Sequence, residues 1–152
     1  MASVCLYFQV HQPYRLRRYS VFDSTPQYFD DEANARIVRR VAEKCYLPAN
    51  LLLRELLRRY PRDFRVAFSI TGVALEQLRA HAPDVIETFR QLAATGQVEF
   101  LAETYYHSLA MLYSPKEFRT QVDLHRAAML QYFTQTPEVF RHTELIFSND
   151  VA

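Results

Sequence analysis

The feature that most constrains the fold of this chain is a repeated change of hydrophobic period along its 152 residues. Runs in which apolar side chains recur every second residue, as in a strand, are followed by runs in which they recur every third or fourth residue, as in a helix. The strand-like runs are expected at residues 3–11, 64–70, 98–103 and 139–144. Strands that alternate with helices predict an α/β protein with a parallel sheet and right-handed crossovers, in the order βαβαβαβ.

The segments between these runs carry boundary signals. Residues 12–32 read as a polar, aromatic-rich loop, and long ordered loops are often functional. A helix over 33–44 is followed by Pro48, which fits the first turn of a second helix, so two helices that meet at a turn are expected. Gly96 is suited to the position after a helix. Ser114, followed by a proline and an acid in the first turn, predicts the start of the clearest helix.

Composition excludes several classes of function. The chain is 49% hydrophobic with a net charge of +1, so a single globular domain is expected, and neither nucleic acid nor a membrane is favoured as a partner. Two glycines are too few for a glycine-rich phosphate loop. Cys5 and Cys45 lack CxxC spacing, so both are expected to be buried small side chains. No secretion signal or membrane-spanning run is apparent, which predicts a cytoplasmic protein.

The number of β/α units predicts an incomplete architecture. Four units fill half of a closed β/α barrel, and the sequence stops after them without a capping helix. A truncated chain or a half-barrel that pairs with something is therefore expected. The alternative is a small open α/β sheet that is complete in itself. An open half-barrel would expose the apolar edge of its last strand, which predicts self-association.

Polar residues at the carboxyl ends of the expected strands are the first candidates for a functional site, because ligands of parallel α/β proteins bind there. They are His11, Ser69 or Thr71, Glu103 and Glu144. The imidazole of His11 could donate to a substrate hydroxyl or move a proton, although a histidine at a strand end is more often structural.

The segment at 96–109 concentrates further polar side chains, with Glu99, Glu103 and His107 beside two tyrosines. Two acids on one strand face repel each other unless they are solvated or partnered. The segment is therefore either an interior cluster with a functional role or an ordinary solvent-exposed strand face. Aromatic rings beside hydrogen-bonding acids suit carbohydrate, because sugars present apolar C–H faces as well as hydroxyls.

A metal site receives little support from the spacing of possible ligands. His11, His107 and His142 could combine with the carboxylates, yet no HxH, HxxxH or CxxC pattern is present. No metal and no other cofactor is therefore expected.

The segments FQVHQPYRL (8–16), GQVEFLAETYYHSL (96–109) and VFRHTELIF (139–147) together resemble glycoside hydrolase family 57, the α-amylase-like enzymes that act on glucans. AEKCYLPANLLL (42–53) also takes part, so the resemblance covers nearly the whole of 1–152 as the amino-terminal part of a longer catalytic domain. It implies the first half of an incomplete seven-stranded β/α barrel that cleaves or transfers α-glucan chains with retention of configuration.

The same resemblance implies roles for individual residues. Glu144 matches the catalytic nucleophile, and His11 matches a histidine that lines the sugar subsite. Glu99 matches an acid associated with substrate contact, while Glu103 and His107 are implied as pocket residues. We therefore expect Glu144 and His11 to share one cavity at the mouth of the sheet.

Two features of the resemblance bear on activity. The general acid of the family is an aspartate much further along a full-length chain, and retention requires two carboxyl groups about 5 to 5.5 Å apart, so these 152 residues alone are expected to be inactive. His142 stands where relatives commonly have asparagine, which could change the pKa of the adjacent nucleophile or the shape of the pocket.

Three hypotheses follow for the function. The leading one is an α-amylase or glucanotransferase that takes an α-glucan or a maltooligosaccharide as substrate. The second is a catalytically degenerate relative that binds glucan without cleaving it. The third is a metal-dependent hydrolase on a related barrel.

Overall fold

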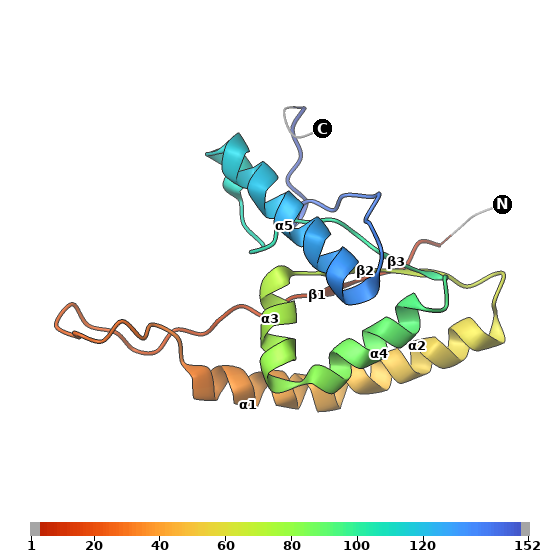
Figure 1. Ribbon diagram of the computed structural model, residues 1–152, viewed down its shortest axis with the longest axis horizontal. Coiled ribbons are helices and arrows are strands. Elements are labelled where there is room, and N and C mark those ends of the chain that lie inside the picture. The colour runs from red at the N-terminus through yellow and green to blue at the C-terminus, as the bar shows by residue number, and fades with distance from the viewer. Residues whose placement is uncertain (1–3, 150–152) are drawn as a thin grey trace.

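The computed structural model describes residues 4–149 and contains a three-stranded parallel sheet in the order β1-β2-β3 (Figure 1). The strands are β1 (Tyr7–Val10), β2 (Val66–Ile70) and β3 (Val98–Phe100). The expected α/β class with parallel strands is confirmed. Position 3 of the first expected strand and residues 150–152 lie outside the described residues.

Helical segments connect and cover the strands. They are α1 (Asp31–Val41), a π-helical segment (Ala42–Tyr46), α2 (Leu47–Arg59), α3 (Gly72–His81), α4 (Pro83–Ala93) and α5 (Pro115–Phe133). In Figure 1, α1, α2 and α4 run below the strands and α5 runs above them. Within residues 4–149, none of the helices combines the length and apolar character that crossing a membrane requires.

The expected turn between the first two helices is wrong, because the helical backbone continues through Ala42–Tyr46. The N–H of Leu47 bonds to the carbonyl of Ala42, five residues earlier, which widens the helix by one residue. A proline in an ordinary helix lacks an N–H and collides with the carbonyl four residues before it. The wider π turn directly before Pro48 accommodates the proline without ending the helix.

The expected fourth strand is also wrong. Phe140 makes an isolated parallel bridge with Ala102, through a bond from Ala102 N–H to the Val139 carbonyl and one from Arg141 N–H to the Ala102 carbonyl. The chain then enters a 3-10 turn at Thr143–Leu145. The third strand, expected at 98–103, ends at Phe100. A strand continues only while its backbone is paired with a neighbour, and the pairing of β3 with β2 stops there.

The hydrophobic core lies between one face of the sheet and the helices. Phe68 of β2 meets Phe89 of α4 edge to face at 5.1 Å, and Phe100 of β3 stacks on Phe133 of α5 at 4.2 Å. These aromatic pairs fix α4 and α5 against the strands. The opposite face of the sheet is polar, and Gln9 of β1 is aligned there with Ser69 of β2.

The loop from residue 11 to residue 30 extends from the body at the left of Figure 1. Leu16 and Phe29 form an antiparallel bridge across it, so the loop predicted from the sequence is confirmed and is ordered by its own backbone pairing. The expected burial of the cysteines is wrong: Cys5, which precedes the edge strand β1, and Cys45, in the π-helical segment, are both exposed and free.

Candidate active site

The carboxyl edge of the sheet brings together four of the five residues that the sequence singled out. His11 follows β1 directly, Glu103 lies three residues after β3, and His107 lies in the turn that follows. Glu144 reaches the same place from the 3-10 turn at the end of the described chain. Parallel strands all end at one edge of a sheet, which is why segments more than 100 residues apart meet here.

His107 lies at the centre of this cluster. Its ring stacks on the ring of His11, with 4.2 Å between the centroids. Its Nδ1 is 3.4 Å from Oε2 of Glu103, and its Nε2 is 3.3 Å from Oε1 of Glu144. His11 and Glu144 thus both contact the same imidazole, at the edge of the sheet where the sequence predicted them.

The backbone is bent sharply at two positions in the cluster. His107 and Glu144 both have φ of 55°, in the left-handed region that side chains other than glycine rarely adopt. Such conformations cost about 1 to 3 kcal/mol and persist where the surrounding structure holds them, most often at functional sites. At Glu144, the hydroxyls of Thr104 and Thr143 support the turn through a buried contact of 2.8 Å.

The two carboxylates of the cluster have different environments. Glu103 is fully buried and accepts a hydrogen bond of 2.6 Å from the hydroxyl of Ser69. The side chain of Glu144 is 65% exposed, so a ligand can reach it. The pair thus combines a fixed interior acid with an accessible one.

His11 is held in the same network. Its Nδ1 is 3.0 Å from Oγ1 of Thr71, which also caps α3 by accepting a bond from Ala74 N–H. Burial lowers the pKa of His11 below its ordinary value, and the nearby His107 lowers it further, while Glu103 opposes both. Both effects favour the neutral form of the ring.

Three residues of the site were not anticipated from the sequence. Gln9 has its amide nitrogen 3.4 Å from Nε2 of His107, and Arg141 donates from Nη2 to Oε1 of Gln9 at 3.0 Å. Gln9 could have been found by its parity, since it lies two residues before His11 on the same strand face. His125 of α5 is fully buried and contacts the Ile70 carbonyl at 2.8 Å, which supports the end of β2.

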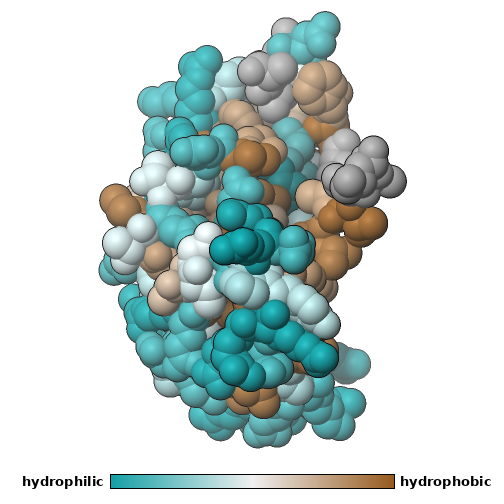
Figure 2. Space-filling view, turned by 90° about the vertical axis from the view of Figure 1, so that its right-hand side faces the viewer, coloured by the Kyte–Doolittle hydropathy of each residue, from teal (hydrophilic) through white to brown (hydrophobic). Residues whose placement is uncertain are grey.

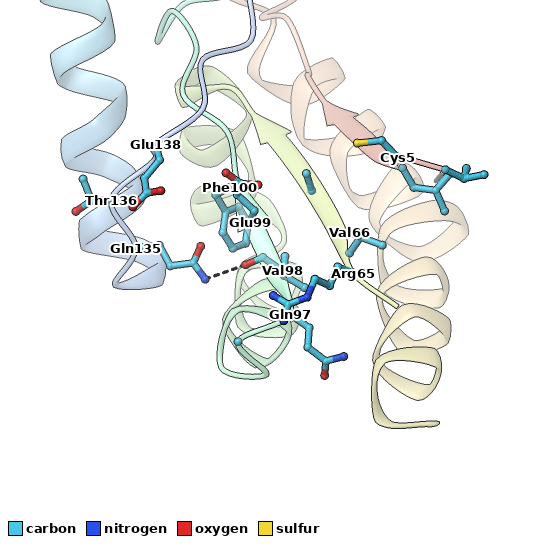
Figure 3. Close-up of a pocket in the computed structure, with 14 residues that line it drawn as sticks. Cys5, Arg65, Val66, Gln97, Val98, Glu99, Phe100, Gln135, Thr136 and Glu138 are labelled. Carbon is cyan, nitrogen blue, oxygen red and sulfur yellow. Dashed lines mark hydrogen bonds between the residues drawn. The ribbon is translucent and has the colours of Figure 1, made fainter. Parts of the chain in front are cut away.

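Glu99 does not join the cluster. It lies on β3 opposite Ala67, at the amino end of the strands, and is exposed. A cavity of about 670 Å³ opens there between the strands and the segment after α5, with Glu138 on its far side (Figure 3). Figure 2 looks onto this end of the molecule and shows apolar surface interspersed with hydrophilic side chains. Barrel enzymes place their chemistry at the opposite, carboxyl end of the strands.

His142 turns toward α5. Its ring stacks on Phe118 at 6.0 Å and meets Phe140 at 5.7 Å, and its Nδ1 is 2.9 Å from the carbonyl of Thr143. Among residues 4–149, no group of three or more histidine, cysteine or acidic side chains is arranged to hold a metal ion.

Comparison with known proteins gives one family. The sequence model described as Glycosyl hydrolase family 57 matches residues 5–152. A relative from Methanocaldococcus jannaschii, named "Putative alpha-amylase", is 40% identical over 149 residues. The match covers 95% of this chain but 32% of the relative, so the chain spans about a third of its length.

Solved structures give the same result for the fold. The chain is similar to 4-alpha-glucanotransferase from Thermococcus litoralis, with a TM-score of 0.70 and 16% identity over 97% of this chain and 20% of that one. It is also similar to a GH57 branching enzyme from Thermococcus kodakaraensis, with a TM-score of 0.62 and 16% identity over 92% of this chain and 32% of that one. The chain therefore has the fold of one part of these larger proteins.

Proposed function

Because the chain belongs to glycosyl hydrolase family 57, we propose that it acts within a retaining glycoside hydrolase or glucanotransferase whose substrates are α-glucans. The observation that carries this proposal is the accessible carboxylate of Glu144 at the carboxyl edge of the sheet, within 3.3 Å of His107, which stacks on His11. A carboxylate that a sugar can reach is one of the two carboxyl groups that a retaining glycosidase requires.

The proposal includes the place of this chain in a larger protein. Its match covers nearly all of its own length and about a third of the relative from Methanocaldococcus jannaschii, at 32%. The polar sheet face that carries Gln9 and Ser69 suits the interior of a barrel mouth, where substrate and further strands would meet it. We assign residues 1–152 to the amino-terminal part of a catalytic domain.

In the reaction, an oxygen of Glu144 attacks the anomeric carbon of the glucan and the bond to the leaving oxygen breaks, which leaves a glycosyl ester on Glu144. A general acid protonates the leaving oxygen. Water, or the hydroxyl of a second glucan, then loses its proton to the conjugate base of that acid and attacks the anomeric carbon. The bond from this carbon to Glu144 breaks, and the original configuration of the sugar is restored. The choice between water and a hydroxyl separates hydrolysis from transfer.

The general acid lies outside the described cluster. Glu103 is fully buried and already bonded to Ser69 and His107, so it cannot reach a leaving oxygen. We assign the acid to an aspartate in another part of the native polypeptide. His11 keeps a different role: its Nδ1 is held by Thr71, and its neutral ring offers Nε2 to a sugar hydroxyl.

The experiment uses α-maltosyl fluoride and maltoheptaose with the polypeptide in its native length. Fluoride leaves without acid assistance, so its release reports the nucleophile alone, while new reducing ends or longer glucans report the complete reaction. Glu144→Gln should lower fluoride release about 10³-fold or more, because the amide cannot attack. Glu138→Gln, an exposed acid in the same segment, is the matched control and should keep wild-type rates.

The outcomes separate the hypotheses. Mass spectrometry should find the maltosyl group on the peptide that contains Glu144. A wild-type protein that binds maltoheptaose but releases neither fluoride nor product would be a glucan-binding relative without catalysis. Undiminished turnover by Glu144→Gln would reject the nucleophile assignment.

A further inference from the structure

We infer that His107, held by the buried carboxylate of Glu103, positions the carboxylate of Glu144 and stabilises it when the glycosyl ester is hydrolysed. This inference rests on the proposed function, since it takes Glu144 as the nucleophile. His107 and Glu103 are positioning residues in this scheme, because neither of them touches the reacting carbon.

The first support is the arrangement of donors and acceptors around His107. Nδ1 faces Oε2 of Glu103 at 3.4 Å, and Nε2 faces Oε1 of Glu144 at 3.3 Å. Ionised carboxylates only accept hydrogen bonds, so Nδ1 donates to Glu103, and the contact of Nε2 with Glu144 is an ion-pair distance when the ring carries a second proton. Hydrogen bonds between an imidazolium and a carboxylate are charge-assisted and stronger than neutral ones.

The second support is the burial of Glu103. Its side chain has no exposed surface, and its other oxygen is occupied by the hydroxyl of Ser69. A buried carboxylate is costly unless it is paired and hydrogen-bonded, so Glu103 and a protonated His107 stabilise each other. Glu103 thereby fixes the ring in one orientation, with Nε2 directed at Glu144.

The third support is a second partner for the same nitrogen. The amide nitrogen of Gln9 is 3.4 Å from His107 Nε2, and Arg141 donates to the amide oxygen of Gln9, which sets the orientation of that amide. An amide N–H can donate to Nε2 only when the nitrogen carries no proton. His107 therefore has a partner in each state: Glu144 when Nε2 is protonated, and Gln9 when it is not.

The consequence for the reaction follows from where charge appears. When water attacks the ester, the bond between the anomeric carbon and Glu144 breaks and its electron pair returns to the carboxylate, while the conjugate base of the general acid takes the proton of water. Negative charge thus reappears on Glu144 in this step. A protonated imidazole that already lies 3.3 Å from Oε1 stabilises that charge without reorganisation. The left-handed backbone at His107 and Glu144 keeps the two side chains facing each other.

The experiment compares His107→Phe and Glu103→Gln with wild type in the native-length polypeptide. Phenylalanine keeps a ring to stack on His11 but has no donor, and Glu103→Gln is nearly isosteric, so it tests the same idea if the first variant folds poorly. His81→Phe and Glu87→Gln are matched controls, since His81 ends α3 and Glu87 is exposed on α4. Thermal unfolding monitored by circular dichroism establishes that each variant is folded.

With α-maltosyl fluoride, both variants should show a burst of fluoride followed by slow turnover, because the ester forms and then accumulates. We expect kcat to fall roughly 10- to 100-fold, the effect of one charged hydrogen bond, with little change in the burst amplitude. Intact-protein mass spectra should show the maltosyl form at steady state. The two control variants should match wild type.

The separation of burst from turnover gives a readout that a purely structural role would not move. The groups that face His107 are His11 after β1, Gln9 on β1, Glu103 after β3 and Glu144 in the 3-10 turn. Loss of the ring beside Glu144 should slow the step that returns charge to that carboxylate, so kcat should fall while the burst stays near its wild-type amplitude.

Two results would overturn the inference, and they are distinguishable. If wild type releases no fluoride, the proposed function fails and the inference fails with it. If wild type turns over and Glu144→Gln does not, but folded His107→Phe and Glu103→Gln keep kcat within threefold and show no accumulated maltosyl form, the inference alone fails.

Discussion

The contact between Gly72 and Tyr105 yields a prediction about stability that the structure makes specific. Gly72 is the first residue of α3, and a Cβ atom placed on it would overlap the ring of Tyr105. The hydroxyl of Tyr105 donates to Oε1 of Glu76 at 2.9 Å, so the ring is fixed at both ends. Gly72→Ala must therefore displace the ring.

The size of the effect follows from three contributions. Overpacking of this kind costs about 1 to 3 kcal/mol. Losing the Tyr105–Glu76 hydrogen bond adds roughly 0.5 to 1.5 kcal/mol. Replacing glycine by alanine in a helix returns up to about 1 kcal/mol, and less than that at the first position. The net expectation is a destabilisation of about 1 to 3 kcal/mol, or a fall in Tm of roughly 3 to 10 °C.

The assay is a double-mutant cycle followed by urea and thermal unfolding. In a Tyr105→Ala background the ring is gone, so Gly72→Ala should cost little or should stabilise, which gives a coupling energy of about 1 to 3 kcal/mol. Gly96 is the matched control: its φ is +69° and nothing lies within 4 Å of a Cβ there. Gly96→Ala should cost about 1 kcal/mol in both backgrounds. Equal costs of Gly72→Ala in the two backgrounds would refute the reasoning.

Three further predictions concern pH and association. Burial lowers the pKa of His11 and of His125 in the folded state, so the unfolded chain takes up protons first as the pH falls. The free energy of unfolding should therefore fall as pH drops below about 6.5, and equal values from urea titrations at pH 7.5 and 5.5 would contradict this. Burial and the hydrogen bond to Glu76 raise the pKa of Tyr14 to about 12, so stability should decline as pH rises from 10 toward 12, and the decline should be smaller in Tyr14→Phe. The self-association expected of an open sheet edge should appear in sedimentation as a mass that rises with protein concentration. Val139 is 50% exposed beside the bridge between Ala102 and Phe140, so Val139→Lys should reduce the association. A mass that this variant leaves unchanged would count against this edge.

The strands were the most predictable part of the fold. Alternation places Val10, Phe68 and Phe100 on one side of their strands, and these side chains form the core in the structure. The cap at Ser114 was equally predictable, because its hydroxyl accepts the bond from Glu117 N–H that the local sequence indicates. Both features depend on residues that are close together in the sequence.

The errors arose where distant backbone decides the outcome. Residues 139–144 have the composition of a strand but pair at one position, since strand formation requires a neighbouring ladder and not only a suitable sequence. Pro48 indicated a helix boundary, whereas the π turn before it absorbs the missing N–H. Cys5 alternates with apolar neighbours, yet it precedes an edge strand and stays exposed.

The candidate site divides in the same way. His11 and Glu103 were identified because parallel strands must end at a common edge. Glu144 was identified on the same ground, but it reaches that edge from a 3-10 turn and not from a strand. The central place of His107 was not foreseeable, because it depends on a left-handed turn after β3 that brings one ring within 3.4 Å of Glu103 and 3.3 Å of Glu144. Glu99 shows the reverse case, since its segment suggested the site while its position along β3 places it at the opposite end of the sheet.

The sequence by itself determined the hydrophobic periods of the strands and helices, the helix caps, and which acids and histidines are available for chemistry. These properties are set by side-chain type and local spacing. Tertiary structure alone decided which of them meet. Distances of 3.3 and 3.4 Å around one imidazole arise from three segments whose relative positions depend on sheet pairing and core packing. Such long-range contacts form only when the buried apolar surface of the whole domain offsets the entropy of closing the chain between them.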